Sequence, residues 1–208
     1  KSIDDNYLSK CYKARLGLVM SNTSLHKGYV DKARKYCNDI LNSDVPETLK
    51  SIGYLYLGNS YIMESYNESL KYLEQGLYIT EKYDYKYYNV QIKRSLNFLM
   101  NYWGVTPKYI DNISNDIADL HEVAFMYIRK NDKTMALQIL DSINIDSLNN
   151  LQKGFHYFYR GLINNSKELF YKSVTHFKLT GEKYYLSLPL IELKKLGENE
   201  MILNALSV

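Results

Sequence analysis

Two asparagines stand out among the polar side chains, because each directly follows a small residue inside an apolar segment with helical spacing. Asn22 follows Ser21, and Asn59 follows Gly58 within residues 54–77, YLYLGNSYIMESYNESLKYLEQGL. A side-chain amide offers two donors and an acceptor, which suits the main chain of an extended peptide. We therefore expect both amides to face an inner wall and hold a peptide backbone. The alternative is that both are solvated or bonded to their own helices.

Two acidic residues, Glu122 and Glu182, fall on or near the first helices of the late helical pairs. Arginine pairs with a carboxylate through two parallel hydrogen bonds. If the bound peptide carries a basic residue, one of these acids is its predicted partner. The alternative is that both are ordinary surface acids.

The sequence has no pattern typical of an enzyme. The four histidines, His26, His121, His156 and His176, lack the spacing of metal ligands. The HExxH, GxSxG, Walker and Rossmann patterns are absent. We predict no catalytic residue, metal or cofactor, and we expect His156 and His176 to face helix packing or solvent.

Composition favours a folded, helical chain. Of the 208 residues, 46% are hydrophobic and 24% charged, which is sufficient for a core. Only three prolines and ten glycines occur in the sequence, so we expect long helices with short turns.

Cys11 and Cys37 are expected to be buried free thiols. No apolar run is long enough to span a membrane and no signal peptide is visible, so we expect a cytoplasmic protein that does not bind membranes. Because the first residue is Lys1, we expect part of a longer protein.

Apolar residues recur at helical spacing along almost the whole chain. The predicted helices cover residues 6–26, 29–42, 47–64, 66–82, 85–102, 114–130, 132–143, 147–164, 166–179, 182–195 and 198–206. Ser147 and Ser166 are the predicted N-caps of two of them. Trp103 is expected to plug the core at a helix end, with stacking on a ligand as the alternative.

The helices pair in the pattern of the tetratricopeptide repeat, in which small residues let two helices approach closely. Small residues at positions 33, 69, 136 and 173 are spaced by 36, 67 and 37 residues. Since 67 is about two repeat lengths, a degenerate unit containing residues 91–104 should lie between. We therefore predict an all-α, right-handed superhelix over residues 1–186, with the first helix of each pair lining the concave wall.

Residues 187–208 are expected to form capping helices with an apolar outer surface, although a terminal repeat normally presents a polar one. Such a surface favours a partner, here a second copy of the chain. The alternative is a cap folded onto the previous pair. The predicted dimer residues are Leu188, Ile191, Leu196, Ile202, Leu203 and Leu206.

Four segments resemble the carboxy-terminal part of AimR proteins, the arbitrium peptide receptors of temperate Bacillus phages. They are residues 54–77, QIKRSLNFLMNYWG, GFHYFYRGLINNSKELFYKSVTHFK and SLPLIELKKLGEN. The resemblance implies a sensor for a secreted, re-imported peptide of about six residues ending in Arg-Gly-Ala. It also implies dimerisation through the C-terminal helices and an amino-terminal helix-turn-helix DNA-binding domain, which this chain lacks. In such receptors the peptide abolishes DNA binding, and lysogeny replaces lysis.

The resemblance also implies site residues. It assigns Asn22 and Asn59 to the peptide backbone, and Glu122 and Glu182 to polar contacts with the peptide. Phe98 matches an apolar wall, His121 stands where relatives carry an amide, and Asn150 is a looser match for which Asn149 is the alternative. Two other functions fit the repeats: a tetratricopeptide scaffold for a protein partner, and a Rap-like regulator with a different head domain.

Overall fold

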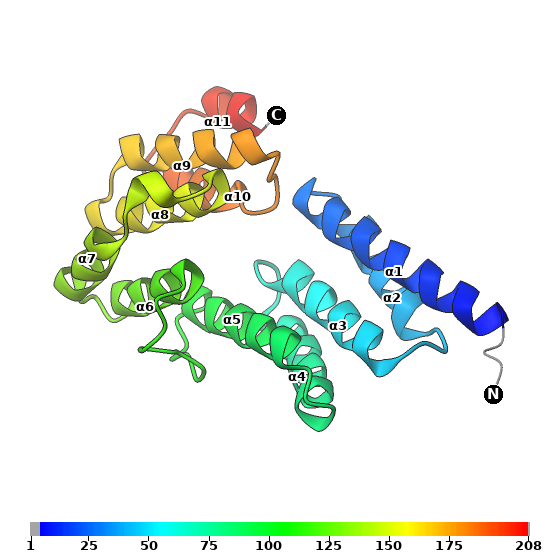
Figure 1. The fold of residues 1–208 in the computed structure, drawn as a ribbon. Coiled ribbons are helices and arrows are strands. Elements are labelled where there is room, and N and C mark those ends of the chain that lie inside the picture. Colours follow the sequence, from blue (N-terminus) through cyan, green and yellow to red (C-terminus); the bar gives the residue numbers. More distant parts are fainter. Residues whose placement is uncertain (1–4, 208) are drawn as a thin grey trace. The chain divides into compact units, whose positions relative to one another are not determined.

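A computed structural model describes residues 5–207, and these form eleven α-helices and one short 3-10 helix, with no strand among them (Figure 1). The all-α prediction is therefore confirmed. Contacts divide the chain into two compact units. The first holds the described residues up to Leu25 together with Tyr29–Tyr109, and the second holds His26–Gly28 and the described residues from Ile110 onward.

The first unit is built from helical hairpins. Helices α1 (Asp5–His26) and α2 (Val30–Leu41) form one hairpin. Helices α3 (Glu47–Tyr61) and α4 (Tyr66–Lys82) form the next, and α5 (Lys86–Tyr102) packs on α4. The core between the first pair and α3 consists of six buried apolar side chains: Ala14, Leu18, Ile40, Val45, Leu49 and Ile52.

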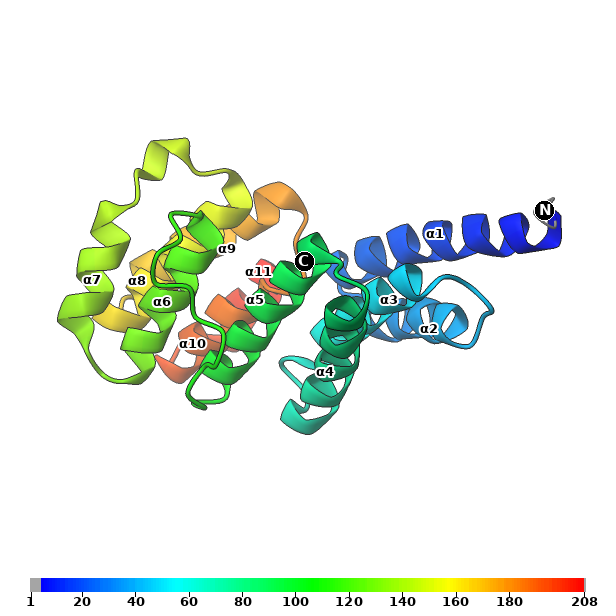
Figure 2. The ribbon, with the colours of Figure 1, turned by 60° about the horizontal axis from the view of Figure 1, so that its bottom comes forward.

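The second unit continues in the same manner (Figure 2). Helix α6 (Ile117–Arg129) pairs with α7 (Lys133–Ser142), and after the 3-10 turn at Ile145–Ser147, α8 (Asn150–Asn164) pairs with α9 (Lys167–Thr180). Helices α10 (Ser187–Lys195) and α11 (Glu200–Ser207) close the unit, with α10 packed against α9 and α8.

Small residues allow the paired helices to approach, as the repeat pattern predicts. A Cβ atom added at Gly58 would lie 2.6 Å from Leu73 Cγ, and one at Gly161 would lie 2.6 Å from Phe170 Cε1. These distances are shorter than any van der Waals contact, so only glycine fits without a shift. Opposite the glycines, Ser69 Oγ donates to the Gly58 carbonyl (2.9 Å) and Ser173 Oγ to the Gly154 carbonyl (2.7 Å).

The degenerate middle unit has a first helix, α5, but no second helix. Residues 103–116 are irregular where the second helix would stand, which accounts for the doubled spacing between Ser69 and Ala136. The expectation that Trp103 plugs the core is wrong, because its side chain is 44% exposed. Its indole N–H instead donates to the Ile62 carbonyl (2.7 Å) just after α3 ends.

Side-chain hydrogen bonds explain two of the differences between the predicted and observed helix starts. The helix expected at 182–195 begins at Ser187, because the Glu182 carboxylate accepts the backbone N–H groups of Tyr184 (2.9 Å) and Tyr185 (3.1 Å) and shapes a turn there. Ser147 is not the cap of α8. Asn149 is, through a capping box with Gln152, whereas Ser166 caps α9 as predicted.

Both cysteines are free thiols, as expected. Cys37 is fully buried, with its sulfur 2.9 Å from Ser21 Oγ, and burial raises the pKa of this thiol to about 11. Cys11 is only partly buried, so the expectation of burial holds for Cys37 alone.

Candidate functional site

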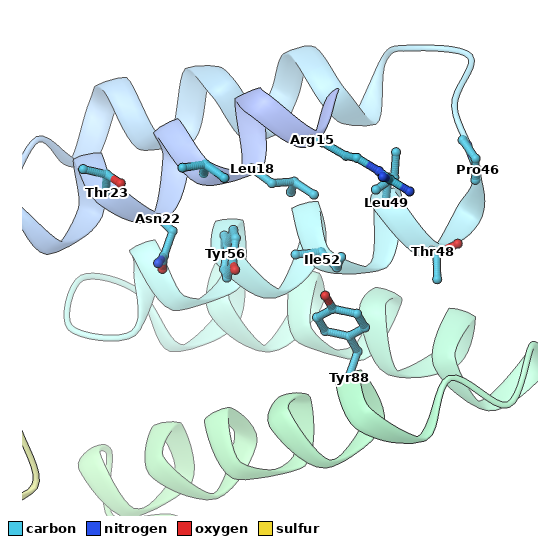
Figure 3. A pocket seen from close by; sticks show the side chains of 11 residues that line it. Arg15, Leu18, Asn22, Thr23, Pro46, Thr48, Leu49, Ile52, Tyr56 and Tyr88 are labelled. Carbon is cyan, nitrogen blue, oxygen red and sulfur yellow. The ribbon is translucent and has the colours of Figure 1, made fainter. Parts of the chain in front are cut away.

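The first helices of successive pairs in the first unit share an open pocket of about 580 Å³ (Figure 3). This volume lies within the range of small-ligand sites. Three helices line the pocket. Helix α1 contributes Arg15, Leu18, Val19, Asn22 and Thr23. Helix α3 contributes Thr48, Leu49, Ile52 and Tyr56, together with Pro46 just before it, and α5 contributes Tyr88. Within this unit, the first helices therefore line a common pocket, as the repeat pattern predicts.

The pocket combines an apolar floor with polar hydrogen-bonding groups. Leu18, Leu49 and Ile52 belong to the core, and Tyr56 and Tyr88 pack against it. Burial is the main cause that raises the pKa of the Tyr56 phenol, with the neighbouring Tyr88 adding to it. The Tyr56 hydroxyl therefore remains neutral and able to donate at physiological pH.

Asn22 lies in this pocket, half-buried, and Tyr56 lines the same pocket from α3 (Figure 3). Asn59 lies three residues after Tyr56 on α3, also half-buried, and its amide oxygen is a buried atom. Asn59 is not among the residues that line the pocket. Phe98 is buried on α5, where its ring stacks on Tyr102 with 6.3 Å between centroids. The peptide-binding roles of these three residues remain predictions.

In the second unit, His121 belongs to a buried polar chain. Its Nε2 lies 3.4 Å from His156 Nδ1, and Arg160 Nε donates to His156 Nε2 (2.9 Å). Arg160 also pairs with Asp141. Because the guanidinium can only donate, His156 Nε2 is the acceptor, so the Nδ1–H of His156 donates to His121.

Burial is the main cause that lowers the pKa of His121 to about 3 and that of His156 to about 4, so both rings are neutral near pH 7. The expectation that His156 faces helix packing is confirmed, since it is fully buried. The link to His121 was not predicted. The sequence feature that could have indicated this contact is the 35-residue separation between the two histidines. It is about one repeat length, so both rings lie at equivalent positions of successive first helices.

The two predicted acids are both buried rather than at the surface, with Glu122 8% and Glu182 2% exposed. Glu182 Oε1 accepts the two N–H groups of the turn before α10, and Oε2 pairs with His26, whose pKa is raised by this hydrogen bond. The alternative of ordinary surface acids is therefore wrong for both residues.

Asn149 and Asn150 have separate tasks at the start of α8. The Asn149 side chain accepts the Gln152 N–H (2.9 Å) as the helix cap. Asn150 is exposed, and its Oδ1 lies 3.0 Å from His176 Nδ1 on α9. Both amides therefore form hydrogen bonds within the second unit. The peptide contact assigned to Asn150 remains a prediction.

The six predicted dimer residues do not share one exposed face. Leu188 (2% exposed) and Leu203 (8%) are buried within the unit, which corrects the expectation that they point outward. Leu196 and Leu206 are partly buried, whereas Ile191 and Ile202 are exposed. Met201, which is not among the predicted dimer residues, is the most exposed large apolar side chain of α11, at 80%.

Two negative observations apply to the part of the chain that the structure describes. Between residues 5 and 207, no three histidine, cysteine or acidic residues come together in a group that could hold a metal ion. In the same range, no helix has both the length and the apolar character required to cross a membrane.

Stacked helical hairpins with small residues at their crossings, and a pocket on the face of the first helices, define a tetratricopeptide-like repeat protein. The chain belongs to the AimR transcriptional regulator-like family, whose sequence profile matches residues 1–195. Two curated relatives carry the name AimR transcriptional regulator, so this is a family of regulators and not of enzymes.

Similar proteins include the AimR transcriptional regulators of Bacillus phage SPbeta and Bacillus phage phi3T. The first is 30% identical over 98% of this chain and 52% of its own length, and the second is 28% identical over 99% and 54%. This chain thus spans about half the length of these relatives. Among solved structures, phAimR superposes with a TM-score of 0.88 at 29% identity over 99% of this chain and 53% of that one. A phAimR–ligand structure gives 0.83 at 30% identity over 90% and 55%.

Proposed function

We propose that this chain is the peptide-sensing domain of a phage transcriptional regulator that controls the choice between lysis and lysogeny in a bacterial host. It binds a short arbitrium peptide of about six residues ending in Arg-Gly-Ala along the first-helix face. Binding switches off DNA binding by the full-length protein.

The pocket on α1, α3 and α5 is the observation that carries this proposal. It offers an amide, hydroxyl groups and an apolar floor on one wall, which suits the alternating polar main chain and side chains of an extended peptide. Membership of a regulator family with a ligand-bound structural relative supports it further. The same membership favours a receptor over a general scaffold or a Rap-like module.

The proposed partner of the peptide's arginine is one of the two buried acids, Glu122 or Glu182. Glu182 was an equal candidate from sequence, but its carboxylate already accepts two backbone N–H groups and pairs with His26. Breaking these contacts would strand buried N–H donors, each at a cost of about 1–3 kcal/mol. We therefore propose that the Glu182 carboxylate chiefly supports the turn before α10.

We further propose that the full-length regulator is a homodimer formed through the C-terminal helices. Ile191, Ile202 and Met201 supply its exposed apolar surface, since Leu188 and Leu203 are already buried within the unit. Peptide binding would then act by favouring one state of the repeats and so changing the spacing of the two DNA-binding domains.

A hexapeptide ending in Arg-Gly-Ala is expected to bind and stabilise this chain. At a hundredfold excess of peptide over its Kd, the gain in folding free energy is about 2.7 kcal/mol. A pool of hexapeptides with randomised first three residues provides the ligand for a thermal-shift screen, and calorimetry on the active members gives the Kd. A matched pool ending in Ala-Gly-Arg is the control. No stabilisation by any Arg-Gly-Ala peptide would reject the receptor function.

Replacing Asn59 by alanine is expected to weaken binding of the active hexapeptide by about 1–3 kcal/mol, because buried polar groups of the peptide lose their partner. Asn22→Ala should have a similar effect, since Asn22 lies in the pocket. Asn38, an exposed amide on the second helix α2, serves as the control position, and Asn38→Ala should leave the Kd unchanged. Equal affinity of the Asn59→Ala variant and the parent chain would remove that residue from the site.

A further inference from the structure

The two oxygens of the Glu182 carboxylate have partners of different kinds. Oε1 accepts the backbone N–H groups of Tyr184 (2.9 Å) and Tyr185 (3.1 Å), so its partners belong to the main chain. Oε2 instead pairs with Nδ1 of His26. The Glu182 side chain is 2% exposed, whereas the His26 side chain is 41% exposed. One oxygen is therefore bound by the main chain, and the other is covered by a side chain that solvent reaches.

The main chain of His26 is held separately from its ring. The backbone N–H of Lys183 donates to the His26 carbonyl (2.7 Å), and this bond does not depend on the rotamer of the imidazole. A change of side-chain rotamer can therefore remove the ring from Glu182 Oε2. The two N–H bonds to Oε1 would remain in place during this change.

Glu182 is the charged group that acts on His26. Its hydrogen bond raises the pKa of the imidazole, although burial opposes the rise. The neighbouring cations Lys27 and Lys183 are exposed, and Glu122, a further buried acid, lies on α6. The ring is therefore a cation at slightly acidic pH and becomes neutral as the pH rises through its raised pKa.

We propose that His26 is an internal competitor for Glu182 Oε2, which the peptide's arginine must displace before it can pair with this carboxylate. The inference rests on the proposed peptide-sensing function and deepens it by naming a regulation of the site. A guanidinium stays protonated throughout the physiological range, whereas an imidazole does not. A lower pH thus strengthens the competitor and leaves the arginine unchanged, so the peptide binds more weakly as the pH falls.

Calorimetry with an active Arg-Gly-Ala hexapeptide tests the competition at about pH 6 and about pH 8.5, on either side of the His26 titration. For the parent chain we expect the Kd to fall about three- to tenfold as the pH rises, the range for an ion pair with one half-exposed partner. The His26→Gln variant keeps a donor for Oε2 but has no titrating charge. Its Kd should match that of the parent chain at the higher pH and should lose this pH dependence.

Lys27→Gln is the matched control, because it removes a positive charge at the position next to His26. Lys27 is exposed and is not a partner of Glu182. This variant should keep the full change of Kd with pH that the parent chain shows. Because all three chains receive the same peptide, titration of the peptide itself cancels in the comparison.

An NMR titration of the His26 ring in the parent chain gives a second readout that needs no variant. In the free chain its pKa should lie above the ordinary value of 6.5. Saturating peptide should return this pKa towards 6.5, because the displaced ring no longer has a carboxylate partner.

The outcomes separate the two proposals. Failure of every Arg-Gly-Ala peptide to bind the parent chain would reject the peptide-sensing function, and the competition with it. Binding with the same pH dependence in the parent chain and His26→Gln would overturn the competition and leave the sensing function intact, as would a His26 pKa that the peptide does not change. Weaker binding to His26→Gln at both pH values would also overturn it, since His26 would then hold the peptide.

Discussion

Replacing Phe177 by alanine should lower the free energy of unfolding by about 3–5 kcal/mol, the usual cost of removing a fully buried aromatic ring. Phe177 is 0% exposed, and its ring fills the space that Gly154 leaves on α8. The ring also packs edge-on against Phe155 at 5.1 Å between centroids. Alanine would leave a cavity at the crossing of α8 and α9, and rigid helices can close such a cavity only in part.

Chemical denaturation at pH 7 measures this loss. Leu179, two residues further along α9 and 64% exposed, provides the control on the same helix. Leu179→Ala should change the free energy by less than about 0.5 kcal/mol, as surface substitutions do. A Phe177→Ala variant that matches the Leu179→Ala variant in stability would mean that α8 and α9 do not pack as described.

Acidification from pH 6.5 to 4.5 should destabilise the fold by about 2–5 kcal/mol through His121 and His156. Their folded pKa values, about 3 and about 4, lie below the unfolded value of 6.5. The unfolded chain therefore binds more protons in this range. The stabilising contribution is complete above pH 6.5 and is lost as the pH falls towards the folded values. Over two pH units, one ring can lose at most about 2.7 kcal/mol of its contribution to the folding free energy. Coupling between the two rings keeps the total loss below twice this value.

Arg160 and Asp141 are charged groups on the His156 side of the pair, and the buried Glu122 directly follows His121 on α6. His26 acts in the opposite sense, because Glu182 raises its pKa. Its contribution is fully present below pH 6.5, so it stays constant across the measured range. His176, whose pKa is lowered by partial burial, adds in the same direction as the buried pair.

Denaturation curves recorded every half pH unit test this expectation, with His121→Gln as the comparison. Glutamine cannot take up a proton, so the variant should lose about half of the pH dependence, whatever its stability at pH 7. An unfolding free energy that does not change from pH 6.5 to 4.5 in the parent chain would show that the two rings are solvated in solution.

The fold was accessible from the sequence because its signals are local. Helical periodicity predicts most helices to within a few residues, and small residues such as Gly58 and Ser173 mark crossings where nothing larger fits. The irregular conformation of residues 103–116 is harder to predict, because the doubled repeat spacing indicates a degenerate unit but not a missing helix.

Side-chain partners were less accessible, because tertiary packing decides them. Periodicity places His121 on a first helix, but it does not reveal that the ring turns towards His156. Apolar type alone cannot distinguish Leu203, buried within its own unit, from Ile202, which is exposed one position earlier. Periodicity predicts that Glu182 belongs to a helix, whereas its carboxylate organises the turn before the helix.

The irregular connection at 103–116 offers an exposed position for attaching a label. Its tip is shaped by short-range bonds, since Asp111 Oδ1 accepts the N–H groups of Ile113 (2.9 Å) and Ser114 (3.0 Å), and the Ile113 side chain is 90% exposed. Side chains at such a tip contribute little to packing. A fluorophore or an affinity tag grafted at Ile113 would therefore leave the hairpins and the first-unit pocket undisturbed while reporting on the chain.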